Sequence, residues 1–303
     1  MKLRLSLDAL AVLDAIERKG SFSAAAAELH RVPSAVTYQI RKLEQELGTA
    51  LFDRAGHRAR LTAAGETLLA EGRHLLRAAG ALERKVQQVA AGWETELHIA
   101  VGDLIPLERL YPLIERFYRE QAGGTRLRLM TEVYGGCWDA LVSGRADLAI
   151  GAPGEGPPGG GYASRPLAQV NFVFVVAPDH PLAERPEPQG NADILTFRAV
   201  TAADSSRNLP PRTSGLLSGQ DLLTVPDMPA KQAAHRAGLG VGYLPDYLAR
   251  ADVEAGRLKV KAVEEGKAAI GLVTAWCTGH RGRALQWFLR RLEQRETVAA
   301  LFA

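Results

Sequence analysis

The sequence predicts a mixed α/β protein with an all-helical head, a long linker helix and an α/β body. Residues 1–62 carry short helix-periodic segments, residues 63–92 carry an unbroken heptad pattern, and residues 93–303 alternate strand-like with helix-like segments. A chain of 303 residues is long enough for two or three domains. We therefore take these three ranges as the head, the linker helix and the body.

Composition excludes several classes of protein. Cys137 and Cys277 are the two cysteines and lie far apart, so neither a disulfide framework nor a cysteine-based zinc site is expected. The first twenty residues include Asp8, Asp14 and Glu17, which a secretory signal sequence would not carry. The longest apolar run, residues 172–177, is too short to cross a bilayer. We expect a soluble cytoplasmic protein that does not enter a membrane.

Basic residues are concentrated in the N-terminal part of the chain. Residues 1–91 hold fourteen Lys and Arg against ten Asp and Glu, whereas the rest of the chain is close to neutral. A mild positive balance of this kind suits a module that binds phosphates.

The head contains the pattern of a helix-turn-helix. Residues 21–29, SFSAAAAEL, predict a short helix that Ser21 or Ser23 caps. His30 stands at the turn, where a histidine tolerates a left-handed backbone, and Pro33 is expected as the first residue of the next helix. Two helices joined by so tight a turn form a motif whose second helix can enter the major groove of DNA.

The second of these helices has one apolar side and one polar side. Val36, Ile40, Leu43 and Leu47 fall on one stripe at helical spacing, and polar side chains lie opposite. The alternative is an ordinary solvated helix face. The residues expected to meet DNA from this helix and its start are Arg31, Pro33, Ser34, Thr37, Tyr38 and Arg41.

A basic hairpin is expected next. Residues 48–62, GTALFDRAGHRARLT, have strand-like ends around Gly56 and predict a wing that completes a winged helix-turn-helix. Arg54, Arg58 and Arg60 are expected to reach phosphates or the minor groove. The alternative for each arginine is a solvated loop position.

The linker helix carries a continuous apolar seam. Positions from Leu61 to Val89 alternate spacings of four and three, which favours pairing with the same helix of a second subunit. Packing of this helix on its own chain is the alternative. The residues expected at the dimer interface are Leu68, Leu75, Leu82, Val86 and Val89.

These motifs together resemble the LysR-type transcriptional regulators. The resemblance rests on SFSAAAAELHRVPSAVTYQIRKLEQELGTALFDR, LTAAGETLL, APDHPL at 177–182 and GLGVGYLP at 238–245. It implies a two-lobed effector domain like a periplasmic binding protein, with lobe 1 at about 93–163 and 268–303 and lobe 2 at about 164–267. The chain departs from the family at residues 31–33, where members usually have an apolar residue, Ser or Thr, and Gln, so the N-cap hydroxyl and a base-reading amide of the family are missing here.

The effector site is expected where strands of the body end. Ligands of open α/β sheets bind at the carboxyl ends of strands. For each residue the alternative is a loop or cap position. The candidates are Asp103, Leu104, Tyr134, Thr201, Ser205, Ser206, Arg207 and Asp227. The mixed donors and acceptors suit a polar ligand that is neutral or weakly charged, because a single arginine beside two aspartates does not suit a dianion.

No catalytic or cofactor motif stands out. Residues 154–159, GEGPPG, match a dinucleotide-binding pattern, but Pro157 and Pro158 cannot open a helix there, so we interpret them as a loop between the lobes. No metal or cofactor is expected beyond the small-molecule effector. The alternative is an α/β enzyme or a solute-binding protein with an added helical domain. Against the enzyme, the sequence shows no nucleophile with a general base. Against the solute-binding protein, it shows no signal sequence.

Three segments point to a branch of the family. TEVYGGCWDAL, GRADLAIGA and DSSRNLP look most like LysR-type regulators of purine or allantoin metabolism. The resemblance implies a purine or ureide effector, a homodimer or homotetramer on double-stranded promoter DNA, and RNA polymerase as a further partner.

Overall fold

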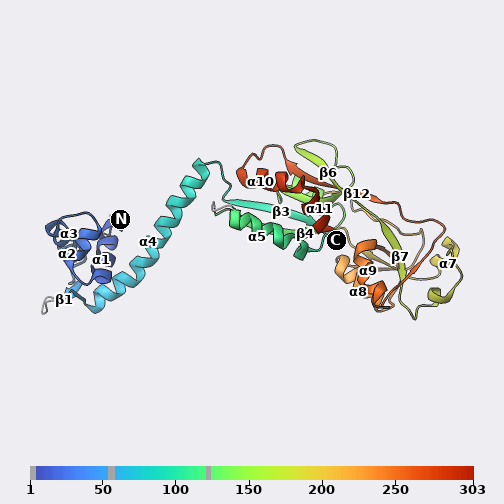
Figure 1. Cartoon of the computed structure of the whole chain (residues 1–303), viewed down its shortest axis with the longest axis horizontal. Helices are drawn as coiled ribbons and strands as arrows, with labels where there is room; N and C mark the ends of the chain where they lie inside the picture. The colour runs from blue at the N-terminus through green and yellow to red at the C-terminus, as the bar shows by residue number, and fades with distance from the viewer. Residues whose placement is uncertain (1–4, 54–58, 121–123) are drawn as a thin grey trace. The chain divides into compact units, whose positions relative to one another are not determined.

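The computed structural model describes residues 5–53, 59–120 and 124–303. For residues 84, 85 and 88 within these ranges, only the backbone is described. The chain forms two compact units, Met1–Gln87 and Gln88–Ala303, and each is described by itself (Figure 1). Arg54 and Arg58, two of the arginines expected in the wing, lie outside the described residues.

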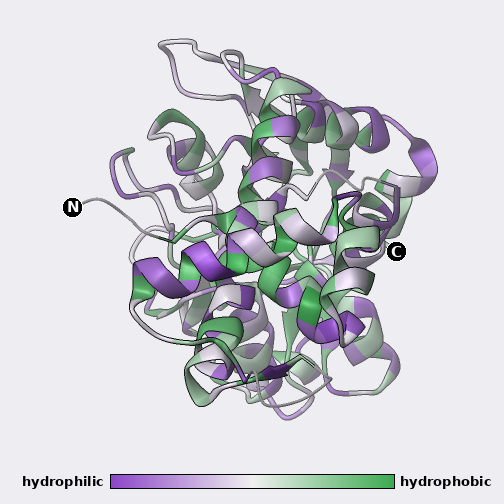
Figure 2. Cartoon of the chain, turned by 90° about the vertical axis from the view of Figure 1, so that its left-hand side faces the viewer, coloured by the Kyte–Doolittle hydropathy of each residue, from purple (hydrophilic) through white to green (hydrophobic). Residues whose placement is uncertain are grey.

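Three helices form the head. They are α1 (Leu7–Lys19), α2 (Phe22–Glu28) and α3 (Pro33–Leu47). Ser21 caps α2 by accepting a hydrogen bond from the backbone N–H of Ala24 at 3.2 Å. His30 has a φ of 52°, and α3 begins at Pro33, so the expected turn is confirmed. Apolar side chains from all three helices form one core, and these helices show apolar and polar residues along their length (Figure 2).

A buried carboxylate joins α3 to the wing. Strands β1 (Phe52–Asp53) and β2 (Arg60–Leu61) pair antiparallel as the expected hairpin. Glu44 of α3 is 9% exposed and accepts the backbone N–H groups of Leu51 and Phe52 at 2.8 and 3.3 Å. Two backbone donors at the start of the wing are therefore satisfied by one side chain.

The linker helix α4 (Ala63–Ala90) changes its surroundings along its length. Its first turns pack on the head: Leu68 and Leu69 join the core of the head, and Gly72 lies against Leu10. Farther along, apolar side chains are exposed. The exposed fractions are 49% for Leu75, 62% for Leu82, 61% for Val86 and 58% for Val89. The seam thus divides into a part used within the chain and a part that no described residue covers.

The first lobe of the C-terminal unit is built on a five-stranded sheet in the order β4-β3-β5-β12-β6. Strands β3, β4 and β5 run parallel, and β12 runs antiparallel to both of its neighbours. The strands are β3 (Glu96–Gly102), β4 (Arg126–Glu132), β5 (Leu148–Pro153), β6 (Tyr162–Val170) and β12 (Ile270–Cys277). The helices of this lobe are η1 (Leu107–Leu110), α5 (Tyr111–Glu120), α6 (Gly136–Val142), α10 (Arg283–Leu292) and α11 (Arg295–Leu301).

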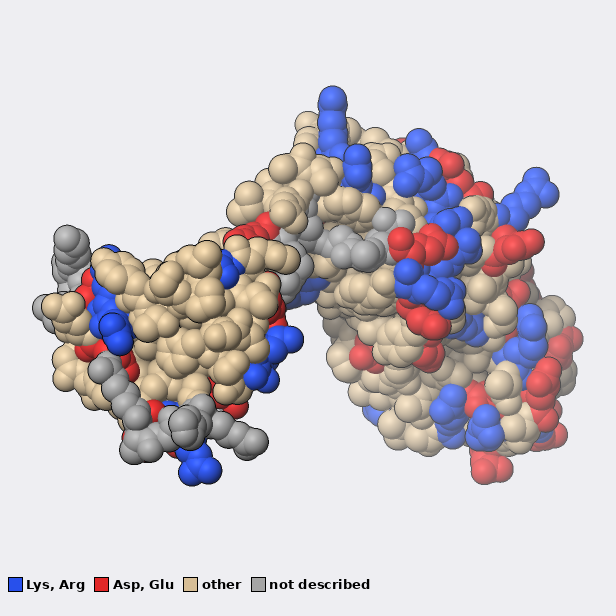
Figure 3. Space-filling view, turned by 60° about the vertical axis from the view of Figure 1, so that its left-hand side comes forward, with Lys and Arg blue, Asp and Glu red and all other residues tan. Residues whose placement is uncertain are grey.

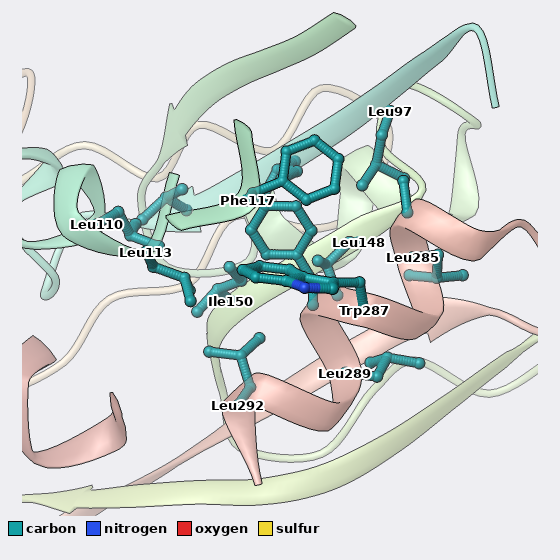
Figure 4. Close-up of a cluster of buried hydrophobic side chains, with 14 of the residues drawn as sticks. Leu97, Leu110, Leu113, Phe117, Leu148, Ile150, Leu285, Trp287, Leu289 and Leu292 are labelled. Carbon is teal, nitrogen blue, oxygen red and sulfur yellow. The ribbon is translucent and has the colours of Figure 1, made fainter. Parts of the chain in front are cut away.

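Aromatic side chains hold the helices of the first lobe to its sheet. Phe117 of α5 packs against Trp287 of α10, with the ring centroids 5.1 Å apart, above leucine and isoleucine side chains of the strands (Figure 4). Rings packed edge to face stabilise such a contact beyond the area they bury. This core gives the strand ends at the edge of the lobe a rigid base.

The second lobe has two small sheets, in the orders β10-β7-β11 and β8-β9, joined by a bridge between Ala199 and Val241. Its strands are β7 (Phe172–Val176), β8 (Ala199–Ala202), β9 (Leu222–Val225), β10 (Gly242–Pro245) and β11 (Lys259–Lys261). Its helices are η2 (Pro181–Glu184), α7 (Asn191–Leu195), α8 (Met228–Arg236) and α9 (Asp246–Glu254). No helix in the described part of the chain is both long and apolar enough to span a bilayer.

Two sequence interpretations need correction. The pairing of β6 with β12 places β6 in the sheet of the first lobe, so the chain crosses to the second lobe near Asn171 and not at 163/164. The GEGPPG segment at 154–159 connects β5 to β6 and therefore lies within the first lobe, not between the lobes.

Replacement of Glu44 by alanine should destabilise the head. The substitution leaves two buried N–H groups without an acceptor, and we expect a loss of about 1–3 kcal/mol in the free energy of unfolding. Hydrogen exchange of the Leu51 and Phe52 amides together with urea unfolding measures this loss. Gln45→Ala on the exposed side of α3 is the matched control and should change stability by less than about 0.5 kcal/mol. Equal stability of the two variants would contradict the role of Glu44.

Candidate DNA-binding and effector-binding sites

The recognition helix α3 presents a polar face to solvent. Val36, Ile40 and Leu43 are at most 2% exposed, whereas Tyr38 is 70% exposed. Ser34 and Arg41 are exposed, and Thr37 is half-buried with its hydroxyl donating to the carbonyl of Pro33 at 2.9 Å. Leu47, expected in the buried stripe, is 40% exposed, because the stripe ends as α3 ends. Tyr38, Arg41 and Ser34 are thus free of the core and open to a partner.

Arg31 is held on the surface of the head. Its guanidinium lies 2.7 Å from the Asp8 carboxylate and donates to the Gln39 side chain at 2.8 Å. Gln39 donates in turn to Asp8 at 2.6 Å. Val32 precedes α3 without capping it through a side chain. Because a phosphate can compete with Asp8 for the guanidinium of Arg31, this side chain is available to a DNA backbone at the start of α3.

Basic and acidic side chains are paired on the described surface of the head. Figure 3 shows basic and acidic side chains on the face of the N-terminal unit that it presents. Arg60 is exposed and lies opposite Asp53 in the strand register of the wing. Any affinity of this unit for DNA therefore depends on a few placed cations and hydrogen-bonding groups more than on its net charge.

A small cavity lies where the two lobes of the C-terminal unit meet. Its volume is about 20 Å³, which is room for about one water molecule, so a metabolite requires the lobes to separate. Residues from both lobes line it: Gly102, Asp103, Leu104, Tyr134, Gly151, Pro153, Phe172, Met228, Lys231, Tyr243, Lys267 and Ile270. Of the residues expected from the sequence, Asp103, Leu104 and Tyr134 belong to this lining.

Asp103 connects the two lobes. It follows β3, is 8% exposed, and accepts the backbone N–H of Met228 from the second lobe at 3.1 Å. Burial, together with the nearby charge of Asp227, raises the pKa of its carboxyl to about 7. Asp227 itself caps α8 by accepting the N–H of Ala230 at 2.8 Å.

Two lysines in the cavity were not anticipated from the sequence. Lys231 of α8 is 4% exposed, and burial lowers its pKa to about 8. Burial also lowers the pKa of Lys267 to about 8, and its ammonium lies 3.8 Å from the centroid of the Phe172 ring. The available sequence signal was the position of Lys231 on the buried side of α8, three and four residues before Ala234 and His235.

The other candidate residues lie in a loop that ties the lobes together. The Ser205 hydroxyl donates to the buried Glu132 carboxylate and accepts the N–H of Val133 at 2.8 Å. The Ser206 N–H donates to the Asp204 side chain at 2.7 Å. The Arg207 side chain is exposed. The structure thus places these three residues beside the cavity lining and not in it.

A second buried carboxylate holds the same loop. Asp139 of α6 is fully buried and accepts the N–H groups of Asn208 and Leu209 at 2.8 and 3.0 Å. Arg145 donates to Asp139 at 2.9 Å and also binds Glu132. Thr201 of β8 is buried and hydrogen-bonds the phenol of Tyr134. The second lobe is therefore seated on the first through hydrogen bonds that surround the cavity.

A helix-turn-helix unit joined in one chain to a two-lobed α/β unit with an interlobe cavity defines a ligand-responsive transcriptional regulator. The family model described as "Bacterial regulatory helix-turn-helix protein, lysR family" matches residues 7–66, and the model described as "LysR substrate binding domain" matches residues 90–296. The chain belongs to the LysR family of transcriptional regulators. It is a regulator and not an enzyme.

Relatives extend over nearly the whole chain. The probable HTH-type transcriptional regulator YhaJ of Escherichia coli (strain K12) is 41% identical over 288 residues, which cover 95% of this chain and 96% of the relative. The HTH-type transcriptional regulator PunR of the same organism is 38% identical over 289 residues, or 95% and 93% of the two chains. The probable transcriptional regulator PA0477 of Pseudomonas aeruginosa shares the fold, with a TM-score of 0.63 at 24% identity over 96% and 98% of the chains.

The Asp103 carboxyl should make stability depend on pH. The pKa of this carboxyl is higher in the folded chain than in the unfolded chain. Its contribution to stability is therefore fully present below pH 3.8, the ordinary pKa of an aspartate, and is lost as the pH rises through about 7. The loss is at most about 1.4 kcal/mol per pH unit. Urea unfolding of the ligand-free protein across this window should show the fall, and Asp103→Asn should abolish its share. Asp221→Asn, at an exposed carboxyl, controls for the substitution. A pH profile that Asp103→Asn leaves unchanged would contradict this account.

Proposed function

We propose that this LysR-family regulator reads double-stranded promoter DNA through the exposed face of α3. The observation that carries the proposal is the division of α3 into a buried stripe, Val36, Ile40 and Leu43, and an exposed face that bears Tyr38 and Arg41. A helix docked by one side can place the other in the major groove. Pro33, Ser34 and Thr37 stand at the N-terminal end of the same helix, and Arg31 and Arg60 flank it as phosphate contacts, with Arg54 and Arg58 assigned the same role.

The exposed part of α4 supports self-association. Leu75, Leu82, Val86 and Val89 present apolar surface at heptad spacing, and their burial against a second copy of α4 would remove it from water. Leu68 contributes from the part of the helix that also contacts the head. We propose a homodimer, or a homotetramer built from two such dimers, since paired heads can contact two half-sites. The site of action is the cytoplasm, where promoter DNA and RNA polymerase, a further proposed partner, are found.

The interlobe cavity is the proposed effector site. Asp103, Leu104 and Tyr134 line it directly, and Thr201 contacts Tyr134. Ser205, Ser206 and Arg207 would act on the effector through the loop that seats one lobe on the other, and Asp227 through the start of α8. A flat, hydrogen-bonding purine or ureide suits walls that combine Phe172 and Ile270 with carboxyl and phenol groups.

Loss of the exposed groups of α3 should weaken specific DNA binding. DNA sites are first selected from a random pool with the purified protein, and affinity is then titrated at fixed salt. Tyr38→Ala and Arg41→Ala should each cost about 1–3 kcal/mol on the selected site. Arg60→Ala should instead weaken all sequences alike and reduce the salt dependence. Tyr111→Ala, at a 54% exposed tyrosine of the C-terminal unit, is the control. Unchanged affinity in both α3 variants would reject this recognition face.

Charges placed in the exposed seam of α4 should dissociate the oligomer. Leu75→Glu with Leu82→Glu puts two carboxylates in an apolar interface, where they would be desolvated without partners. Light scattering should show a lower mass, and DNA affinity should fall with it. The control, Ala70→Glu with Arg77→Glu, has the same spacing on another side of α4, where both residues are exposed. A mass equal to that of the parent would show that this seam does not form the interface.

A further inference from the structure

Lys231 is a buried cation with no partner among the described residues. It lines the interlobe cavity at 4% exposure, and the nearby charge of Asp103 favours its protonated form. Among the described residues, however, no carboxylate lies within ion-pair distance of its ammonium and no group accepts a hydrogen bond from it. Burial of an unpaired ammonium is costly, and buried charges in proteins are normally paired. An ammonium kept in this position indicates that its partner is a molecule that enters the cavity.

The second lysine increases the unmatched charge. Lys267 lines the same cavity, and its ammonium lies over the face of the Phe172 ring, 3.8 Å from the ring centroid. Among the described residues that line the cavity, Asp103 is the one carboxylate, and its oxygen already accepts the N–H of Met228. With Asp103 ionised, the lining holds an excess of one positive charge. A ligand with a single negative charge would make the cavity neutral.

We propose that the effector is a small monoanion with a flat, apolar body, whose charged edge binds Lys231 and Lys267 and whose N–H or hydroxyl edge faces Asp103. This proposal rests on the proposed effector site and specifies the chemical class that enters it. The body would lie among Leu104, Phe172 and Ile270, and the phenols of Tyr134 and Tyr243 would add hydrogen bonds. Carboxylates and acidic imide-type heterocycles both have this chemistry.

The same geometry disfavours a phosphate. The first N–H groups of a helix are the usual phosphate-binding groups, but at α8 the Met228 N–H donates to Asp103 and the Ala230 N–H to Asp227. The described residues that line the cavity include no arginine that could bind a dianion through bidentate hydrogen bonds. Two lysine ammoniums beside an aspartate match one negative charge.

A monoanion at this position would also favour one arrangement of the lobes. Asp103 and Tyr134 belong to the first lobe, whereas Lys231 is on α8 of the second. An anion that pairs with Lys231 while its neutral edge contacts Asp103 touches both lobes at once. Its binding energy would therefore favour one relative arrangement of the two lobes over others.

The test compares anionic probes with chemically related neutral compounds. The pairs are urate and hypoxanthine, allantoate and allantoin, and benzoate and benzamide, each added at neutral pH to the full-length protein. Thermal shift and calorimetric titration measure binding. We expect an anionic member to raise the melting temperature while its neutral partner does not. Lys231→Met should weaken binding of that anion at least tenfold, and Lys267→Met should weaken it by a smaller factor.

A ligand-free measurement keeps the result interpretable. Lys231→Met replaces a buried ammonium with an apolar chain of similar length, so the ligand-free variant should melt at a higher temperature than the parent. Lys259→Met, at a lysine 46% exposed and paired with Glu184, is the matched control.

Three results would overturn the proposal: neutral probes that bind as tightly as anionic ones, an anion whose affinity survives Lys231→Met, or no thermal shift from any anionic probe. A neutral probe that binds and whose binding requires Asp103 would reject the monoanion and still support the effector site. Failure of the protein to select DNA sites would instead reject the proposed regulator function.

Discussion

Burial of charge between the two lobes is the constraint on which the C-terminal unit depends. Asp103, Glu132 and Asp139 are each less than 9% exposed, and all three carry hydrogen bonds that cross from one lobe to the other. A buried carboxylate that loses its donors is strongly destabilising. The lobes therefore cannot drift apart gradually, because each carboxylate must either keep its donors or find water.

The buried groups divide into two sets with different consequences. Glu132 and Asp139 both bind Arg145, and Asp139 also accepts backbone N–H groups, so both carboxylates have donors in the absence of a ligand. The cavity beside them holds two lysines and one aspartate and is not balanced. The ion pairs around Arg145 support the junction of the lobes. The cavity with its two lysines is the part where, under our proposal, a small molecule would change the energy of the junction.

Local patterns revealed the head more fully than the body. The turn at His30, the start of α3 at Pro33 and its buried stripe all follow from interactions between residues close in sequence, and the structure has them. The lobe boundary did not follow, because β6 and β7 are separated by Asn171 alone and read as one strand, and their pairing partners lie far along the chain.

The effector site shows the same limit of local patterns. Positions after strand ends identified Asp103 and Tyr134, since the carboxyl ends of β3 and β4 meet at one edge. Lys231 sits within a helix, where a lysine is normally a solvated residue, and it is buried in a cavity lined by residues far apart in the sequence. Binding energy at such a junction can influence DNA only if the heads differ in affinity for DNA between lobe arrangements, and this coupling must then be reciprocal. Under the proposal made above, promoter DNA would raise the affinity of the C-terminal unit for the anion by the same factor by which the anion raises the affinity of the protein for DNA.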